Sequence, residues 1–215
     1  MKAVLFDMDG LIFDTEVVYK QSWQHAAREQ HLELTDAFYR NFIGVQDPEC
    51  ERMLVEHFPE RFDITRYKRD RDQHFHTLRA KGIAIKPGFD ALFNAIKQRS
   101  LPTAIVTSSH HAEVAHNFAN TPYLSQFDLI ITAENVEKGK PHPDCYLMAC
   151  ERLGLEAKDC LVLEDSNNGI KAALAAGCQS IMIPDLLPPD EGINERTIVL
   201  ESLNEVIKRL PKLTS

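Results

Sequence analysis

Short apolar runs alternate with amphipathic helical stretches through the last two-thirds of the chain. Between residues 144 and 153, for example, apolar residues recur at i, i+1, i+4 and i+7, and Gly154 follows as a helix-ending residue. This alternation is typical of a parallel sheet covered by helices on both faces. The chain is therefore predicted to have an α/β fold with a three-layer core. The expected strands are Ala3–Phe6, Thr103–Val106, Leu129–Ile131, Leu161–Leu163 and Ser180–Ile183.

The stretch of residues 15–81 has a different pattern, because it contains no run of β-branched residues and is helical in character throughout. The turn at Lys86-Pro87-Gly88 marks the return to the α/β pattern. We therefore expect two domains, a core made of residues 1–14 and 82–215 and a small all-helical cap made of residues 15–81. The expected helices are Glu16–Gln30, Ala37–Phe42, Glu49–His57 and Ile64–Ala80 in the cap, and Phe89–Gln98, Asp144–Leu153 and Asn167–Ala176 in the core.

The composition limits the partners and the compartment of this protein. Its 215 residues include 24 Lys and Arg against 32 Asp and Glu, a net charge of −8, whereas binding to nucleic acid needs a local excess of basic residues. No apolar run reaches the length of about 18 residues that a membrane helix needs, and Asp7 interrupts the N-terminal run too early for a secretory signal. The five cysteines lack C-x-x-C spacing. We expect a monomer or weak dimer in a reducing cytoplasm, with neither nucleic acid nor membrane as partner.

Two carboxylates follow the first predicted strand in the sequence Asp7-Met8-Asp9-Gly10. Ligands of open α/β folds bind at the carboxyl ends of the strands, where both side chains are expected. Like charges at this spacing disfavour joint ionisation unless a cation lies between them, and Mg²⁺ prefers such oxygen ligands. Taken alone, the pair is explained as well by a structural role, as a helix cap or in a turn, as by a metal site.

Three further strand ends are polar, at Thr107-Ser108-Ser109, Lys138-Gly139-Lys140-Pro141 and Glu164-Asp165-Ser166. The first offers hydroxyl and backbone N–H groups before a helix, which suits an anion, and the second offers a cation. Helix capping explains Thr107 and Ser166 but not the remaining charged residues at the strand ends. The set therefore predicts one functional site at this edge of the sheet.

In order and spacing these four segments resemble the motifs of the haloacid dehalogenase superfamily. The resemblance covers essentially the whole chain. It is closest to the phosphatase and β-phosphoglucomutase-like members with a helical cap, and the core segments are similar to those of pseudouridine-5′-phosphatase and sugar-phosphatase members. It implies a Rossmann-like core and a Mg²⁺-dependent phosphatase that acts on a small phosphorylated metabolite, a sugar phosphate or a nucleoside monophosphate.

The resemblance also implies a role for each motif residue. Asp7 is expected to attack phosphorus and form an aspartyl-phosphate, and Asp9 to act as general acid and then as general base. Phosphoryl transfer depends mainly on positioning and on neutralisation of charge, which agrees with these residue types. Thr107 and Ser108 are expected to bind the phosphoryl oxygens, with Lys140 neutralising charge. The residues expected to hold Mg²⁺ are Asp7, Asp9 through its backbone carbonyl, and Asp165, with Glu164 assisting.

Two residues of the cap bear on the choice between hydrolysis and a phosphosugar mutase reaction. In the mutase branch a His and an Arg are expected to contact the substrate, and Tyr19 and Asp47 occupy the corresponding positions here. Both are candidate substrate contacts. Because Asp47 would repel a doubly charged sugar, hydrolysis is favoured, with the β-phosphoglucomutase-like reaction as the alternative. The presence of Asp9 favours a phosphate ester over the substrates of the dehalogenase and phosphonate-cleaving branches.

Two other classes of protein remain as alternatives. A receiver-like signalling domain combines similar residues, but in another order and without a helical insertion, and a non-catalytic binder of phosphorylated metabolites is natural only if Asp7 or Asp9 is lost. A contribution of His110 and His111 to the site stays open. A cluster of basic residues in the fourth cap helix is expected on a solvated face; its members are Arg66, Lys68, Arg69 and Arg71.

Overall fold

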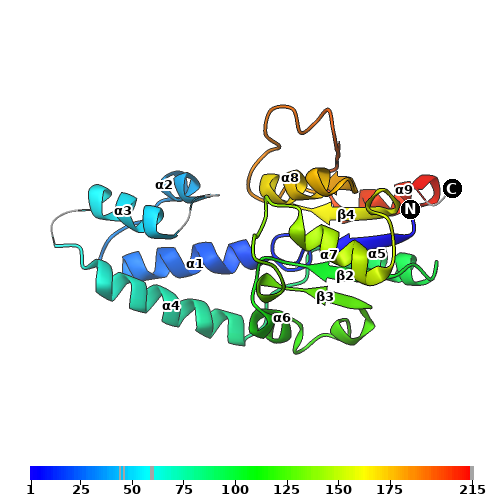
Figure 1. Ribbon diagram of the computed structural model, residues 1–215. Coiled ribbons are helices and arrows are strands. Elements are labelled where there is room, and N and C mark those ends of the chain that lie inside the picture. Colours follow the sequence, from blue (N-terminus) through cyan, green and yellow to red (C-terminus); the bar gives the residue numbers. More distant parts are fainter. Residues whose placement is uncertain (44, 46, 59–60, 214–215) are drawn as a thin grey trace. The chain divides into compact units, whose positions relative to one another are not determined.

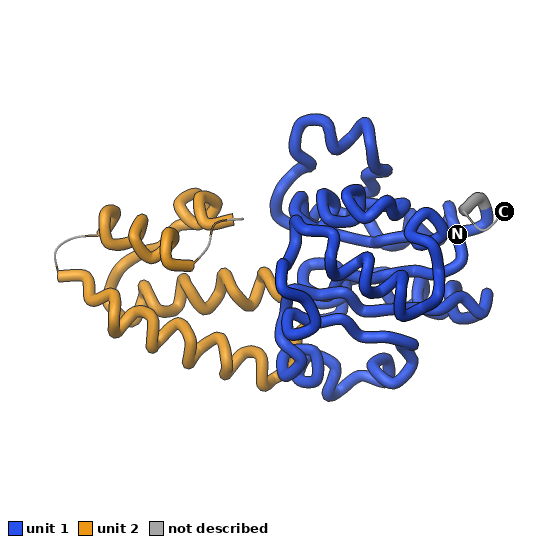
Figure 2. Tube along the Cα trace, in the orientation of Figure 1, with its two compact units in different colours: residues 1–14, 84–215 blue, residues 15–83 orange. Residues whose placement is uncertain are grey.

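The computed structural model describes residues 1–43, 45, 47–58 and 61–213, and these residues form two compact units. Unit 1 contains residues 1–14 and 84–215, and unit 2 contains residues 15–83 (Figure 2). The chain leaves and re-enters unit 1 at neighbouring points, because the Asp14 N–H donates to the Ala84 carbonyl oxygen at 2.9 Å and Phe13 pairs with Ile85.

A parallel sheet forms the centre of unit 1 (Figure 1). Its described strands are β1 (Ala3–Phe6), β2 (Thr103–Val106), β3 (Leu129–Ile131), β4 (Cys160–Glu164), β5 (Gln179–Met182) and β6 (Ile198–Val199), in the order β3-β2-β1-β4-β5-β6. The predicted α/β class is confirmed. β1, β2 and β4 are buried along their whole length, which explains why their sequences are continuous apolar runs. β6 was not predicted, because two residues are too few to give a periodic pattern.

Helices cover both faces of this sheet. They are α5 (Phe89–Lys97), α6 (His111–Phe118), α7 (Asp144–Leu153), α8 (Asn167–Ala176) and α9 (Leu203–Leu213), with 3₁₀ turns η2 (Leu124–Gln126), η3 (Ala133–Asn135) and η4 (Ala157–Asp159). α7 and α8 pack on the face that carries Ala3 and Leu5. On the opposite face, Phe89 and Phe93 of α5 lie 5.9 and 6.2 Å from Phe6, ring centre to ring centre, and α9 packs beside α5.

The carboxyl ends of the parallel strands meet at one edge of the sheet. Asp7 follows β1, Thr107 follows β2, Glu164 ends β4, and Asp185 lies three residues beyond β5. Polar side chains from four strands are thus brought to the edge where ligands of open α/β sheets bind.

Unit 2 has a core of its own, centred on Trp23. The Trp23 ring lies 5.0 Å from that of Phe42 and 6.0 Å from that of Tyr67, and the Tyr67 hydroxyl donates to the Trp23 carbonyl oxygen at 2.8 Å. Among the residues that the structure describes, no helix of either unit is long and apolar enough to cross a membrane. The helices of unit 2 are α1 (Thr15–Arg28), α2 (Asp36–Tyr39), α3 (Asp47–His57) and α4 (Ile64–Ala80), with the 3₁₀ turn η1 (Arg40–Phe42).

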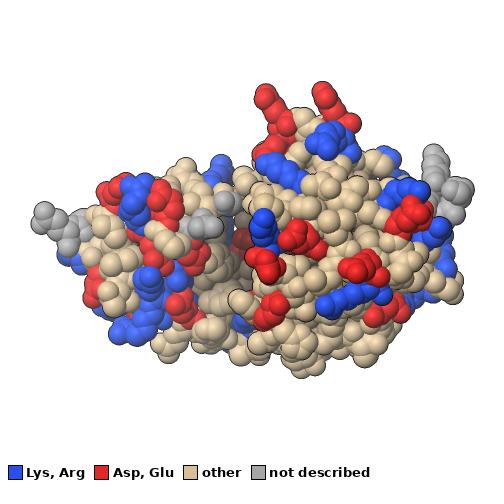
Figure 3. Space-filling model, in the orientation of Figure 1, with Lys and Arg blue, Asp and Glu red and all other residues tan. Residues whose placement is uncertain are grey.

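Basic and acidic side chains are interspersed on the face of unit 2 seen in Figure 3. Three of the four basic residues clustered at positions 66–71 of α4 behave as expected, since they are exposed and pair with carboxylates. The expectation of a solvated face is wrong for Arg71, whose side chain is only 8% exposed. Its guanidinium lies 4.7 Å from the centre of the Trp23 ring and 3.1 Å from Glu51 Oε1, because α4 turns this position toward the core of unit 2.

Gly169, in the first turn of α8, lets this helix approach the side chain of Glu164 at the end of β4. A Cβ atom added there would overlap the carboxylate of the buried Glu164. We expect Gly169→Ala to lower the free energy of unfolding by about 1–3 kcal/mol, the usual cost of overpacking, although alanine favours the helix. Thermal unfolding measures the loss. Gly139→Ala is the control, because a Cβ there meets nothing within 4 Å; equal melting temperatures for the two variants would contradict the account.

Candidate active site

Asp7 lies at the centre of the strand edge. Its backbone N–H donates to the Leu163 carbonyl oxygen at 3.0 Å, which continues the pairing of β1 with β4. Its side chain is 10% exposed, and Oδ1 accepts a hydrogen bond from Lys140 Nζ at 2.6 Å. The carboxylate is therefore held in place by a charged partner while it stays close to solvent.

Lys140 is buried beneath Asp7, with 6% of its side chain exposed. Besides Asp7, its Nζ donates to Glu164 Oε1 at 2.7 Å and to the Val106 carbonyl oxygen at 2.9 Å. An ammonium group has three donors, so these partners satisfy it completely. Burial alone lowers the pKa of Lys140, but the carboxylates of Asp7 and Glu164 raise it well above its usual value, so the side chain stays charged.

Glu164 is fully buried and connects Lys140 to the start of α8. Oε1 also accepts from the Tyr146 hydroxyl at 3.0 Å. Oε2 accepts from the backbone N–H groups of Asp165 and Ser166 at 3.1 and 3.0 Å and from the Ser166 hydroxyl at 2.9 Å. Burial opposes ionisation, but Lys140 and these donors hold the pKa of Glu164 below its usual range. Oε1 thus holds Lys140 and Oε2 holds the start of α8, and a direct role for Glu164 in metal binding stays a prediction.

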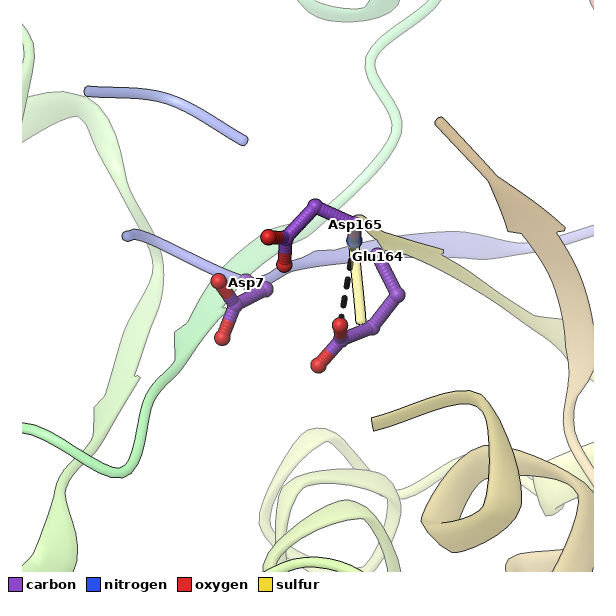
Figure 4. Close-up of side chains that lie close together, drawn as sticks. All are labelled: Asp7, Glu164 and Asp165. Carbon is purple, nitrogen blue, oxygen red and sulfur yellow. Dashed lines mark hydrogen bonds between the residues drawn. The ribbon is translucent and has the colours of Figure 1, made fainter. Parts of the chain in front are cut away.

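The carboxylates of Asp7, Glu164 and Asp165 converge (Figure 4). One oxygen of each lies within 4.8 Å of the others. Burial raises the pKa of Asp7 to about 8 and also raises that of Asp165 well above its usual value. When ionised, the three carboxylates carry two negative charges more than Lys140 compensates. A divalent cation with a preference for oxygen ligands would balance this excess, so the donor set fits Mg²⁺.

The loop after β2 lies next to Asp9. Thr107 is buried, and its hydroxyl accepts from the Ser109 backbone N–H at 3.0 Å, while Ser108 is exposed. The Ser109 hydroxyl donates to Asp9 Oδ2 at 2.6 Å. The sequence had placed Ser109 only among groups that suit an anion, and the structure shows that it also fixes the orientation of Asp9.

Lys86 and Asp185 were not recognised from the sequence as residues of this edge. Lys86 Nζ lies 2.5 Å from Asp185 Oδ1 and 3.7 Å from Asp14 Oδ1. The rule that polar residues follow strands could have found Asp185, because the apolar run of β5 ends just before it. The rule could not have found Lys86, because Lys86 precedes a helix and lies 99 residues before Asp185 in the sequence.

Tyr19 and Asp47, the candidate substrate contacts, both lie in unit 2 and contact each other. The Tyr19 hydroxyl donates to Asp47 Oδ1 at 2.5 Å, and Asp47 Oδ2 lies 3.4 Å from Arg71 Nη1. Burial and the neighbouring Asp47 carboxylate raise the pKa of Tyr19. Arg71 also contacts Glu51 and Asp72, at 3.1 and 2.8 Å, so its one positive charge compensates that of Asp47 only in part. This weakens, without removing, the argument that Asp47 repels a doubly charged substrate.

His110 and His111 stand at the start of α6. His110 Nδ1 lies 3.0 Å from Glu134 Oε1, and the His111 backbone N–H donates to the same oxygen at 3.1 Å. These contacts anchor the first turn of α6, and the structure gives neither residue a contact with the carboxylate cluster.

Comparison with known proteins gives consistent matches. The family described as haloacid dehalogenase-like hydrolase matches residues 4–183. Hexitol phosphatase A of Escherichia coli (strain K12) is 33% identical over 209 residues, 95% of this chain and 93% of that protein. The Drosophila melanogaster protein named "Probable pseudouridine-5'-phosphatase" is 33% identical over 210 residues, 93% of this chain and 88% of that protein. This chain also matches the structure of a provisionally named β-phosphoglucomutase from Thermotoga maritima. The match covers 99% of both chains, with a TM-score of 0.85 and 25% identity.

The raised pKa of Asp7 predicts how stability depends on pH when no divalent cation is bound. Between about pH 4 and pH 8 the carboxyl is ionised in the unfolded chain but stays protonated in the folded one. The folded state then binds more protons, so the free energy of unfolding falls as the pH rises, by at most about 1.4 kcal/mol per pH unit for this group.

Denaturant unfolding in EDTA across this pH range measures the slope. Asp7→Asn removes the titrating group and is expected to flatten the slope and to be more stable than the parent at pH 8. Asp190→Asn serves as control, because Asp190 is half exposed and pairs with Lys171. An unchanged slope in Asp7→Asn would show that Asp7 does not titrate in this range.

Proposed function

The chain belongs to the haloacid dehalogenase-like hydrolases, and from this premise we propose that it is a Mg²⁺-dependent phosphatase of small phosphorylated metabolites. The observation that carries the proposal is the buried contact of 2.6 Å between Lys140 Nζ and Asp7 Oδ1. It fixes a carboxylate at the strand edge through one oxygen and lets the other face a phosphoryl group. The N–H and hydroxyl groups after β2 and the carboxylates of Glu164 and Asp165 at the end of β4 supply the positioning and charge neutralisation that phosphoryl transfer requires.

In the first proposed step Asp7 attacks phosphorus. A bond forms between the Asp7 carboxylate oxygen and phosphorus, the ester P–O bond breaks, and Asp9 gives its proton to the departing alkoxide oxygen. In the second step Asp9 takes a proton from water, the water oxygen bonds to phosphorus, and the bond to Asp7 breaks. Inorganic phosphate is released and both carboxyl groups return to their starting states. Ser109, which donates to Asp9 Oδ2, keeps Asp9 oriented through both steps.

The other residues of the edge bind and neutralise charge. Thr107 and the Ser108 backbone N–H are proposed to hold the phosphoryl oxygens, and Lys140 holds Asp7 in place and favours its ionised form together with the cation. Mg²⁺ supplies charge neutralisation at the phosphoryl group when bound. Asp7, Asp165 and the Asp9 backbone carbonyl are proposed to hold it, with Glu164 acting through Lys140.

The substrate is proposed to be a sugar phosphate or a nucleoside monophosphate. In support, two of the relatives that match over most of the chain are named "Hexitol phosphatase A" and "Probable pseudouridine-5'-phosphatase". Tyr19 and Asp47 of unit 2 are the proposed substrate contacts. A mutase reaction is the second candidate, favoured by the similarity to the Thermotoga maritima structure. We also propose that the protein is a monomer or weak dimer. We place it in a reducing cytoplasm, which suits its five free, buried cysteines.

A panel of sugar phosphates, nucleoside monophosphates and 4-nitrophenyl phosphate tests the proposal, each assayed for phosphate release with Mg²⁺ and with EDTA. Release from a few members that EDTA abolishes is expected. Asp7→Asn should reduce kcat by at least about a thousandfold, because the proposed covalent intermediate forms on the Asp7 carboxylate. Asp190→Asn is the control. Activity of Asp7→Asn near that of the parent would remove Asp7 as nucleophile. If no substrate is hydrolysed, addition of sugar bisphosphates tests the mutase reaction.

Asp9 has a separate signature. With 4-nitrophenyl phosphate, whose leaving group needs no proton, Asp9→Asn should still form the aspartyl-phosphate but hydrolyse it slowly, with kcat lower by about 10²–10⁴-fold. A burst of one nitrophenolate per protein and an acid-stable, hydroxylamine-sensitive phosphoprotein are expected. Steady turnover at the parent rate would exclude Asp9 as the base.

A further inference from the structure

Asp185, in the loop that follows β5, has one carboxylate oxygen that is buried without a partner. Its side chain is 12% exposed, and Oδ1 contacts Lys86 Nζ at 2.5 Å. Oδ2 is inaccessible to solvent and has no hydrogen-bond donor among the described residues. An unpaired buried carboxylate oxygen is costly, so a buried group of this kind usually has a partner in the working state of the protein.

The position of Gly10 shows which way Asp185 Oδ2 faces. A Cβ atom added to Gly10 would overlap Asp165 Oδ2 and would lie 3.3 Å from Asp185 Oδ2. The two oxygens thus flank one point, on the side of Gly10 that has no side chain. Since Asp165 belongs to the carboxylate cluster with Asp7, Asp185 Oδ2 borders the same region. The φ of +80° at Gly10 also disfavours any larger residue there.

Lys86 holds the carboxylate of Asp185 in this orientation. The Lys86 backbone N–H donates to the Ile12 carbonyl oxygen at 2.8 Å, so its main chain is fixed to the segment that carries Asp7 and Asp9. Its ammonium group compensates one negative charge next to the cluster. The side chain is 22% exposed, so the pair is largely shielded from water.

We propose that Asp185 is a positioning residue of the divalent cation site, and that Oδ2 becomes accessible when the cation binds and then accepts a hydrogen bond from a water molecule bound to the cation. This inference rests on the proposed function. A water-mediated contact is favoured over direct ligation because the charge of Asp185 is already compensated by Lys86. In addition, Mg²⁺ usually keeps several of its waters, and carboxylates that orient such ligands are a regular feature of metal sites.

The experiment measures Mg²⁺ affinity by calorimetry on the full chain without substrate. Asp185→Asn and Asp185→Ala are expected to weaken Mg²⁺ binding about 10- to 100-fold, with alanine the weaker binder because it offers no acceptor. Asp190→Asn is the matched control, since it makes the same change in the same loop at a half-exposed residue. Its Mg²⁺ affinity should equal that of the parent.

Two further readouts separate positioning from a structural role. Melting temperatures in EDTA should be nearly equal for the parent and Asp185→Asn, whereas added Mg²⁺ should raise that of the parent more. In the phosphatase assay, Asp185→Asn should need more Mg²⁺ for half-maximal rate while kcat at saturating Mg²⁺ stays within a few fold of the parent. A large loss of stability in EDTA with unchanged Mg²⁺ affinity would mean that Asp185 has only a structural role, its ion pair with Lys86.

The outcomes also distinguish this inference from the proposed function. Parent affinity for Mg²⁺ in both Asp185 variants overturns the role of Asp185 and leaves the phosphatase proposal intact. If the parent binds Mg²⁺ but hydrolyses no substrate, the phosphatase proposal fails, while weaker binding by the variants still supports Asp185 as a positioning residue. Absence of Mg²⁺ binding by the parent overturns both.

Discussion

The buried ammonium group of Lys140 is the interaction on which the rest of the site depends. It joins the carboxyl ends of three strands, since its acceptors are Asp7 after β1, the Val106 carbonyl of β2 and Glu164 of β4. Each acceptor alone would be a costly group to bury, and together they satisfy every donor that a lysine has. Charge compensation at Lys140 therefore determines where the carboxylate of Asp7 lies.

Glycine makes the required density of charge sterically feasible. Glu164 fits beside the first turn of α8 because Gly169 has no side chain, and Asp165 approaches the segment after β1 because Gly10 has none. In both places a carboxylate takes the space that a Cβ atom would fill. The result is a set of buried acids close enough to share a cation, at the edge of a rigid sheet rather than on a long loop.

The sequence was sufficient to predict the sheet and most of the edge, because parallel strands are marked by apolar runs and their carboxyl ends lie together. It could not predict how individual charges are paired. The sequence pattern predicted a solvated Arg71, whereas packing against Trp23 buries it. The ion pair of Asp185 with Lys86 could not be predicted, because the two residues lie far apart in the sequence. The orientation of Glu164 toward Lys140 likewise depends on contacts between separate segments, which no local pattern records.

The junction between the two units has a consequence for how such proteins diversify. The chain leaves unit 1 at Asp14 and returns at Ala84, and these two residues are joined by a backbone hydrogen bond of 2.9 Å. The helical unit is therefore an insertion whose two ends lie side by side in unit 1, like the ends of a closed loop. The entropic cost of closing a loop rises only slowly with its length. Evolution can enlarge, shrink or exchange such an insertion without moving a strand, so the helical unit can vary while the polar strand edge stays unchanged.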